Sequence, residues 1–245
     1  MGITMRVTKR AVARVFCIFF PLLLVLWVLL VLYPNPVKLV ASVQRLIDPG
    51  VDAAAVESVA ASLPSDPAAI EDSVLENIPY RYDWEAYGVP WYFPTVNEVL
   101  QKEAGDCKGR ALVLASVLEA KDIPYSLNTS PIHVWVDYEG KEETSLENQN
   151  AGFYHLDPET GERSFGLPSI DVWETMDTFW QGFWPPMPME RKALLIAGPV
   201  ILIAARVNWV KRATARDGEE ANGTSRRTTQ TETTQGATGK DTTAV

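Results

Sequence analysis

Residues 15–33 form an uncharged run in which almost every side chain is large and apolar. A helix needs about 20 such residues to cross the hydrocarbon core of a bilayer, so this run predicts a transmembrane helix. A cleaved signal peptide is the alternative. The run is longer than a usual signal core, however, and its end, Tyr-Pro-Asn-Pro, lacks a small-x-small cleavage pattern. Residues 1–14 are basic, which predicts a cytoplasmic N-terminus.

A second apolar run covers residues 193–210, which is close to the lower length limit for a membrane span. Arg206 falls inside it and would have to reach the lipid headgroups. The residues before the run include an aromatic cluster of the kind found at membrane interfaces: Phe179, Trp180, Phe183 and Trp184. The alternative is a buried core helix. We expect a second transmembrane helix over residues 193–210, which would return the C-terminus to the cytoplasm.

Acidic and basic residues are distributed unequally between the middle of the chain and its two ends. Residues 34–190 hold 9 Lys and Arg against 26 Asp and Glu, a net charge of -17, whereas the remainder holds 13 against 5, or +8. Such an acidic segment repels nucleic acid, which is excluded as a partner. We therefore expect residues 34–190 to form an extracytoplasmic domain of an integral protein of the cell membrane. Residues 211–245 are poor in large apolar side chains and predict a disordered cytoplasmic tail.

The chain has only two cysteines and two histidines. They cannot build a disulfide framework, and a cysteine-based zinc site would need more ligands than they supply. We therefore expect neither a metal nor a cofactor.

The middle segment shows helical patterns first and strand patterns later. Helices are predicted over residues 52–63, over 67–77 with Asp66 as the cap, over 95–103 and over 107–120. Thr95 and Glu98 have the spacing of a capping box. Short strands are predicted over residues 125–128, 133–138 and 153–157. The order of these elements predicts an α+β fold.

Cys107 lies in the first turn of the helix predicted over residues 107–120. There the helix dipole and unpaired backbone N–H groups favour the thiolate, which is the nucleophilic form of cysteine. The alternative is a small buried apolar side chain, the commonest role of a free cysteine. Gly105, Asp106, Lys108 and Arg110 surround Cys107 and favour an accessible helix end.

A nucleophilic cysteine needs a base, and the base needs a partner that orients it. His133 and His155 are the available bases, and both fall on predicted strands. Asp157 is two residues from His155, too far along one strand for a direct bond. Opposed residues of paired strands are about 5 Å apart, so Asp157 would orient His133 across a hairpin. We expect His133 to be the base and His155 to be a packing or surface residue.

Four blocks of sequence resemble the transglutaminase-like cysteine superfamily in order and spacing, over residues 70–160. They are Glu103-Ala104-Gly105-Asp106-Cys107-Lys108-Gly109-Arg110-Ala111, Ile123-Pro124-Tyr125, His133-Val134-Trp135-Val136-Asp137 and Leu156-Asp157-Pro158. The resemblance implies a papain-like transglutaminase core of helices packed on an antiparallel sheet, here flanked by transmembrane helices. It also implies a catalytic triad of Cys107, His133 and Asp157 that forms a thioester with a peptide or protein amide substrate.

Several alternatives remain at this point. Glu147 or Asn148, in the long polar segment 139–152, could replace Asp157. Trp91 and Tyr92 are candidates for the second oxyanion donor, beside the Cys107 backbone N–H. The acyl acceptor is water or an amine. A binding or assembly module that has lost turnover is the rival function, and a redox sensor would lack a resolving cysteine outside the bilayer.

Overall fold

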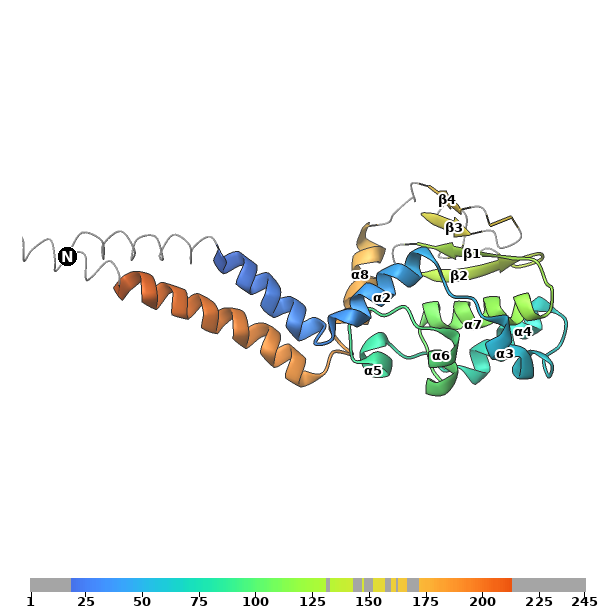
Figure 1. Cartoon of the computed structure of the whole chain (residues 1–245), viewed down its shortest axis with the longest axis horizontal. Helices are drawn as coiled ribbons and strands as arrows, with labels where there is room; N and C mark the ends of the chain where they lie inside the picture. The colour runs from blue at the N-terminus through green and yellow to red at the C-terminus, as the bar shows by residue number, and fades with distance from the viewer. Residues whose placement is uncertain are drawn as a thin grey trace, which may run out of the picture. The chain divides into compact units, whose positions relative to one another are not determined.

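The computed structural model describes residues 19–130, 133–142, 147, 152–156, 160–161, 163–166 and 172–212 (Figure 1). The chain divides into two compact units. One unit joins Met1–Trp27 with Ala193–Val245, and the other is Val28–Lys192. The second unit thus contains the whole of the predicted extracytoplasmic segment.

In the first unit, two apolar helical segments from opposite ends of the chain pack together. Trp27 Nε1 donates a hydrogen bond to the carbonyl of Leu194 at 3.0 Å. The Trp27 ring also fills the space beside Gly198, where an added Cβ would lie only 2.0 Å from Nε1. The Arg206 guanidinium lies 4.6 Å from the centroid of the Phe20 ring. Because residue 27 contacts 194 and residue 20 contacts 206, the two segments run antiparallel.

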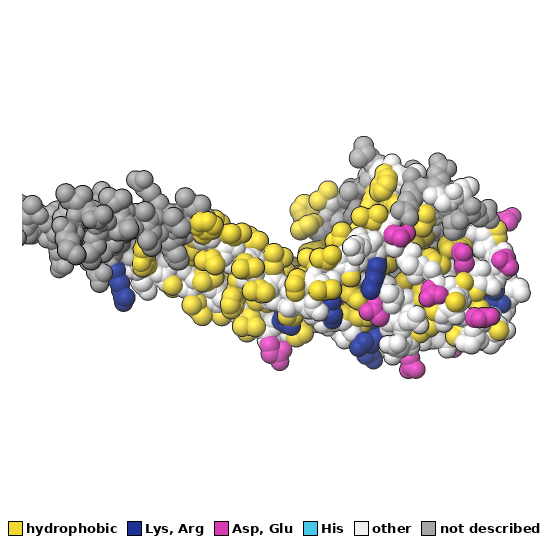
Figure 2. Space-filling view, in the orientation of Figure 1, with side chains coloured by type: hydrophobic (Ala, Val, Ile, Leu, Met, Phe, Trp, Pro, Cys, Tyr) yellow, Lys and Arg dark blue, Asp and Glu magenta, His cyan; other side chains and the backbone are white. Residues whose placement is uncertain are grey.

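Within the described residues, Met189–Arg212 is the one helix that by itself is long and apolar enough to cross a bilayer. The mean hydropathy of its most apolar 18-residue window is 1.9, and only 6% of that window is buried, unlike a helix in a domain core. Phe19–Leu32 passes the same test only together with Pro36–Ile47, from which it is bent by 80°. Hydrophobic side chains make up much of the visible surface along the long helices (Figure 2). Residues 15–18 of the first predicted span lie outside the described residues, and crossing of a membrane stays a prediction.

Two prolines set the bend between Phe19–Leu32 and the helix that follows. Pro34 has no N–H to continue the first helix. Asn35 then caps α2 (Pro36–Ile47) by accepting a bond from the N–H of Val37 at 3.1 Å, and Pro36 occupies the first helical position. The sequence analysis did not predict α2.

The other helices of the second unit are α3 (Ala53–Ala60), α4 (Pro67–Asn77), α5 (Asp83–Tyr87), α6 (Val96–Lys102), α7 (Cys107–Ala120) and α8 (Val172–Phe183). The predicted caps are confirmed. Asp66 accepts from the N–H of Ala69, and Thr95 and Glu98 form both bonds of the capping box at the start of α6. Neither α5 nor α8 was predicted; within α8 the sequence analysis noted only the aromatic cluster at its C-terminal end.

The strands form one antiparallel sheet in the order β2-β1-β3-β4. They are β1 (Tyr125–Thr129), β2 (Val134–Tyr138), β3 (Tyr154–Leu156) and β4 (Arg163–Phe165). Leu127 in β1 lies opposite Val136 in β2 and opposite Leu156 in β3. Strand β1 therefore separates β2 from β3.

Helix α7 is the centre of the core. All residues from Ala111 to Leu118 are buried, as expected of a helix that is apolar on every side. It contacts α3, α4 and α6 as well as strands β1 and β2 (Figure 1). Ser116 ties this helix to the start of α3 by accepting the backbone N–H of Asp52 at 3.0 Å. The α+β class is confirmed, and the architecture places Cys107 at the first position of a buried helix.

Candidate active site

Cys107 is the first residue of α7 and is partly buried, as the sequence predicts. Asp106 caps the helix: its Oδ1 accepts from the N–H of Lys108 at 3.1 Å and of Gly109 at 3.3 Å. These bonds satisfy two of the backbone donors that a helix start leaves free. The cap fixes the direction in which the Cys107 side chain leaves the helix.

A buried ionic cluster lies directly next to Cys107 in the chain. Lys108 forms an ion pair with Asp106 and another with Asp83 Oδ2, the latter at 3.0 Å. Burial raises the pKa of Asp83 to about 7, the nearby charge of Asp106 adds to the rise, and Lys108 opposes both. Burial lowers the pKa of Lys108, but the two carboxylates outweigh it and keep the ammonium charged. The cluster joins the start of α7 to the segment around Tyr92, because Asp83 also accepts the N–H of Tyr92 at 2.8 Å.

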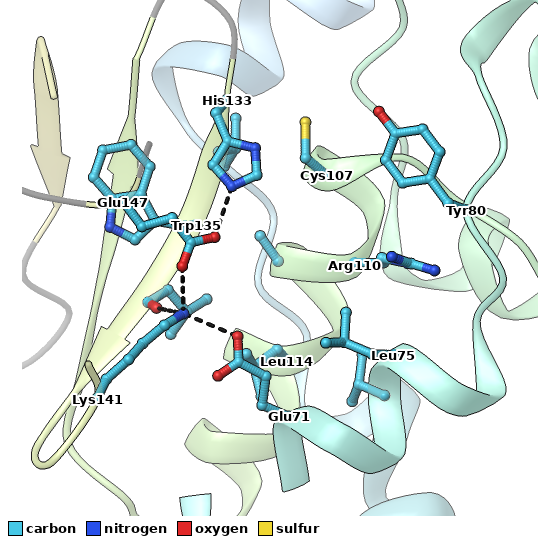
Figure 3. A pocket seen from close by; sticks show the side chains of 14 residues that line it. Glu71, Leu75, Tyr80, Cys107, Arg110, Leu114, His133, Trp135, Lys141 and Glu147 are labelled. Carbon is cyan, nitrogen blue, oxygen red and sulfur yellow. Dashed lines mark hydrogen bonds and ion pairs between the residues drawn. The ribbon is translucent and has the colours of Figure 1, made fainter. Parts of the chain in front are cut away.

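Cys107 opens into a pocket between α4, α7 and β2 (Figure 3). His133, Glu147, Tyr80 and Arg110 line the same pocket. In Figure 3 the sulfur of Cys107 faces the space between the rings of His133 and Tyr80. The pocket therefore brings together a thiol, an imidazole, a carboxylate and a phenol.

His133 lies just before β2, in the turn that joins it to β1. Its backbone N–H donates to Ser130 Oγ at 2.9 Å, and its carbonyl accepts from the N–H of Ser130 at 2.7 Å. The ring stacks on Trp135, with centroids 6.0 Å apart and an interplanar angle of 12°. Backbone and ring are thus both held, which fixes the imidazole relative to Cys107.

Glu147 is the carboxylate that pairs with His133. The distance from His133 Nε2 to Glu147 Oε1 is 2.7 Å. Burial lowers the pKa of His133, but interactions with the Cys107 thiol and with Glu147 outweigh it and raise that pKa to about 9. In turn, the hydrogen bond from His133 lowers the pKa of Glu147 more than burial raises it. The imidazole is therefore protonated at neutral pH, between a thiol and a carboxylate.

Lys141 holds Glu147 from the other side. Its ammonium lies 3.1 Å from Glu147 Oε2 and 2.9 Å from Glu71 Oε1, and it donates to the Val136 carbonyl at 2.8 Å (Figure 3). Glu71 belongs to α4, so the lysine links this helix to the sheet. The carboxylate that faces His133 is consequently fixed by a charged group that is itself mostly buried.

Tyr80 was missed by the sequence analysis. It forms an isolated parallel bridge with Gly105, and the neighbouring Arg81 N–H donates to the Gly105 carbonyl at 3.1 Å. This pairing brings Tyr80 beside Cys107, two residues after Gly105. The Arg110 guanidinium lies 5.3 Å from the Tyr80 ring centroid, and Arg110 Nε donates to the Ile78 carbonyl at 2.8 Å. Its position in an aromatic-rich segment was the available signal, but residues 80–93 hold seven aromatic side chains that look alike in sequence.

The predicted oxyanion donors Trp91 and Tyr92 have other roles. The Tyr92 hydroxyl donates to Glu98 Oε1 at 2.7 Å, and the Trp91 carbonyl accepts from the hydroxyl of Tyr33 at 3.0 Å. Neither residue lines the pocket of Cys107. Neither candidate is the aromatic residue beside the thiol; that place is taken by Tyr80, which the bridge with Gly105 brings there.

Asp157 and Asn148 lie outside the described residues. The hairpin expected to bring Asp157 opposite His133 is not formed, however, because β3 pairs with β1 rather than with β2. His155 lies opposite Asn128, and its Nδ1 is 2.6 Å from Asn128 Oδ1. His155 is not among the residues that line the pocket, which agrees with its predicted packing role.

Across the part of the chain that the structure describes, no group of three His, Cys, Asp or Glu side chains is placed to hold a metal ion. Comparison with family models, with curated proteins and with solved structures finds nothing that matches the chain. The resemblance to the transglutaminase-like superfamily therefore rests on the sequence blocks, and the chemistry must be argued from the pocket itself.

Proposed function

We propose that this protein is a membrane-anchored thiol acyl-transferase or hydrolase that acts on amide or peptide bonds. The observation that carries the proposal is the row of three groups in one pocket: Cys107 at a helix start, His133 beside it, and Glu147 bonded to His133 at 2.7 Å. A thiol, an imidazole and an orienting carboxylate form the set that nucleophilic catalysis by cysteine requires. The finer fold assignment, a papain-like transglutaminase core, is part of the same proposal.

The first half of the reaction is acylation of Cys107. The thiolate attacks the carbonyl carbon of the amide, and the carbonyl oxygen becomes an oxyanion. The backbone N–H of Cys107 and the hydroxyl of Tyr80 are the proposed donors to this oxyanion. His133 then gives its proton to the nitrogen as the C–N bond breaks, so that an amine or ammonia leaves and a thioester remains.

The second half regenerates the thiol. Neutral His133 takes a proton from water, the hydroxide attacks the thioester, and a carboxylic acid leaves as the C–S bond breaks. An amine in place of water would give a new amide. Glu147 keeps the imidazole ring oriented and stabilises its protonated form throughout, which is the role that the resemblance gives to Asp157. Peptides or proteins of the cell envelope are the proposed substrates, because the domain is expected outside the membrane.

A rival proposal is a binding or assembly module that has lost turnover. The ion pairs around Glu147 and the cluster around Lys108 would serve stability in either case. An ion pair with Glu147 raises the pKa of His133 in a binding module as well. The two proposals are therefore separated by the reactivity of the Cys107 thiol, which turnover requires.

The test is the pH dependence of alkylation of Cys107 by iodoacetamide in the full chain. Cys17→Ser makes Cys107 the only thiol. The background protein is compared with His133→Ala and with His155→Ala, a matched control in which the removed histidine lies on β3 against Asn128. We expect the rate midpoint of the background protein to lie well below the value of about 8.5 for a free thiol.

In His133→Ala the midpoint should rise to that of a free thiol, and in His155→Ala it should not move. Such a result would justify a search for substrates among amides and amine acceptors. The proposal fails if all three proteins titrate as a free thiol, or if both histidine variants change the profile equally.

A further inference from the structure

The outer surface of α2 is apolar, and its inner surface carries polar residues together with Leu39 and Leu46, which pack against the buried clusters of the domain. The side chains of Lys38, Ser42 and Arg45 face the domain: Lys38 donates to the Tyr87 carbonyl at 2.8 Å, Ser42 accepts the N–H of Phe93 at 3.0 Å, and Arg45 pairs with Glu98 at 3.0 Å. The opposite face carries the apolar residues Val37, Val40, Val43 and Ile47, of which Val37 is 68% exposed and Ile47 is 56% exposed. A helix on a water-facing surface turns its apolar residues inward, whereas α2 leaves four large apolar residues exposed.

Helix α8 carries a second exposed apolar face. Its C-terminal end is attached to the domain, since Phe183 packs on Trp84 with ring centroids 6.3 Å apart and Gly182 adjoins the Tyr82 ring. Five large apolar residues lie on one 120° arc of the helix and are all exposed: Val172, Trp173, Met176, Phe179 and Trp180. Trp173 is 85% exposed, which is extreme for the side chain with the largest apolar surface. Asp177 and Gln181 lie on the opposite side and bond to each other.

Both helices are directly continuous with the long apolar helices. Three residues separate α2 from Phe19–Leu32, and the 80° bend between them is the turn expected where a chain leaves a bilayer and runs along its surface. Five residues separate α8 from Met189–Arg212. The exposed apolar faces thus occur at the two places where the domain joins the predicted spans.

We propose that α2 and α8 lie in the membrane interface, with these two apolar faces inserted at the level of the lipid headgroups and the first acyl carbons. Amphipathic helices rich in Trp, Phe and Met take this position in a bilayer, and tryptophan favours the headgroup level. The basic residues of α2 are engaged within the domain, and the charged side chain described on α8 is the acidic Asp177. Insertion is therefore driven by apolar burial and takes place on a lipid surface without net charge.

The proposal is independent of the catalytic one and gives the domain a defined orientation. A domain held only by flexible connections could rotate over the membrane, whereas two inserted helices fix which side of it faces the lipid. The pocket of Cys107 is then held at one height and one angle above the bilayer.

The experiment places an NBD fluorophore on single cysteines of the full chain in phosphatidylcholine vesicles, with Cys17→Ser and Cys107→Ser as background. The labelled variants are Val40→Cys on α2 and Met176→Cys on α8. Their matched controls are Val59→Cys, an exposed valine of α3, and Gln181→Cys on the polar side of α8. Quenching is measured with phosphatidylcholine that carries a nitroxide on its acyl chain.

We expect several-fold stronger quenching at positions 40 and 176 than at 59 and 181. Equal quenching at all four positions overturns the proposal. It is also overturned if positions 40 and 176 escape the lipid quencher but change their emission when the protein is diluted in lipid, because a second copy of the chain then covers the two faces.

Discussion

At the scale of single residues, two carboxylates are candidates for the third member of the proposed triad. Glu147 is bonded to His133, whereas Asp157 was expected from a strand pairing that the sheet order does not contain. Because Glu147 raises the pKa of His133, Glu147→Gln should lower that pKa from about 9 toward its ordinary value. The thiolate–imidazolium pair then loses stability, and the pH midpoint of Cys107 alkylation should rise.

The same measurement on Asp157→Asn provides the comparison. Each variant replaces a carboxylate by an amide of the same shape, so the two differ only in which group supports the histidine. We expect Glu147→Gln to move the alkylation midpoint and Asp157→Asn to leave it where it is. The opposite pattern would return the orienting role to Asp157.

A second prediction concerns the buried ionic cluster next to Cys107, the proposed nucleophile. Lys108 neutralises two carboxylates, Asp83 and Asp106, so Lys108→Met would leave both of them buried together without a cation. Removing one partner of a buried ion pair typically costs about 3–5 kcal/mol. We expect a large fall in the thermal midpoint of the detergent-solubilised chain.

The control for Lys108→Met is the double variant with Asp83→Asn, which removes one of the stranded charges. If repulsion between the carboxylates causes the loss, the double variant should recover part of the thermal midpoint, and the two effects will not add. Strict additivity would mean that Lys108 acts by packing its alkyl chain.

At the scale of elements, the sequence predicts those whose boundaries are set locally. Asp66, Thr95 and Glu98 cap their helices as their spacing indicates, and Cys107 begins α7 because Asp106 is a strong cap. Asn35 and Pro36 give the same local signal for α2, but the sequence analysis did not use it. Local reasoning does not show which face of α2 meets the domain, because basic residues lie on its inner face and four large apolar residues are exposed.

Pairing between segments distant in the chain was the other feature that the sequence did not predict. Strands β1, β2 and β3 were predicted within about one residue of their bounds, whereas β4 was not predicted, and nothing local indicates that β3 returns to the far side of β1. The same holds for Tyr80, which reaches Cys107 only through its bridge with Gly105. The proposed nucleophile and base were therefore accessible to local reasoning, while their partners depended on contacts between segments distant in the chain.

At the scale of the whole molecule, charge and apolar segments predict one arrangement across the membrane. The acidic segment 34–190 lies between two apolar helices, and the excess of Lys and Arg lies in the remainder of the chain. Positive flanks favour the cytoplasmic side, so both termini should be cytoplasmic and the domain should be outside. The antiparallel contact of Trp27 with Leu194 is what two adjacent spans would make.

This arrangement is tested with single cysteines introduced into the Cys17→Ser, Cys107→Ser chain in intact cells. Ser62→Cys, in the exposed turn after α3, should react with a membrane-impermeant maleimide, whereas Thr243→Cys should react only after permeabilisation. Labelling of both from outside would mean that Met189–Arg212 does not cross, and the C-terminal helix would then have to lie along the surface. Labelling of neither would place the domain in the cytoplasm, where the pocket of Cys107 would meet cytoplasmic proteins instead of the cell envelope.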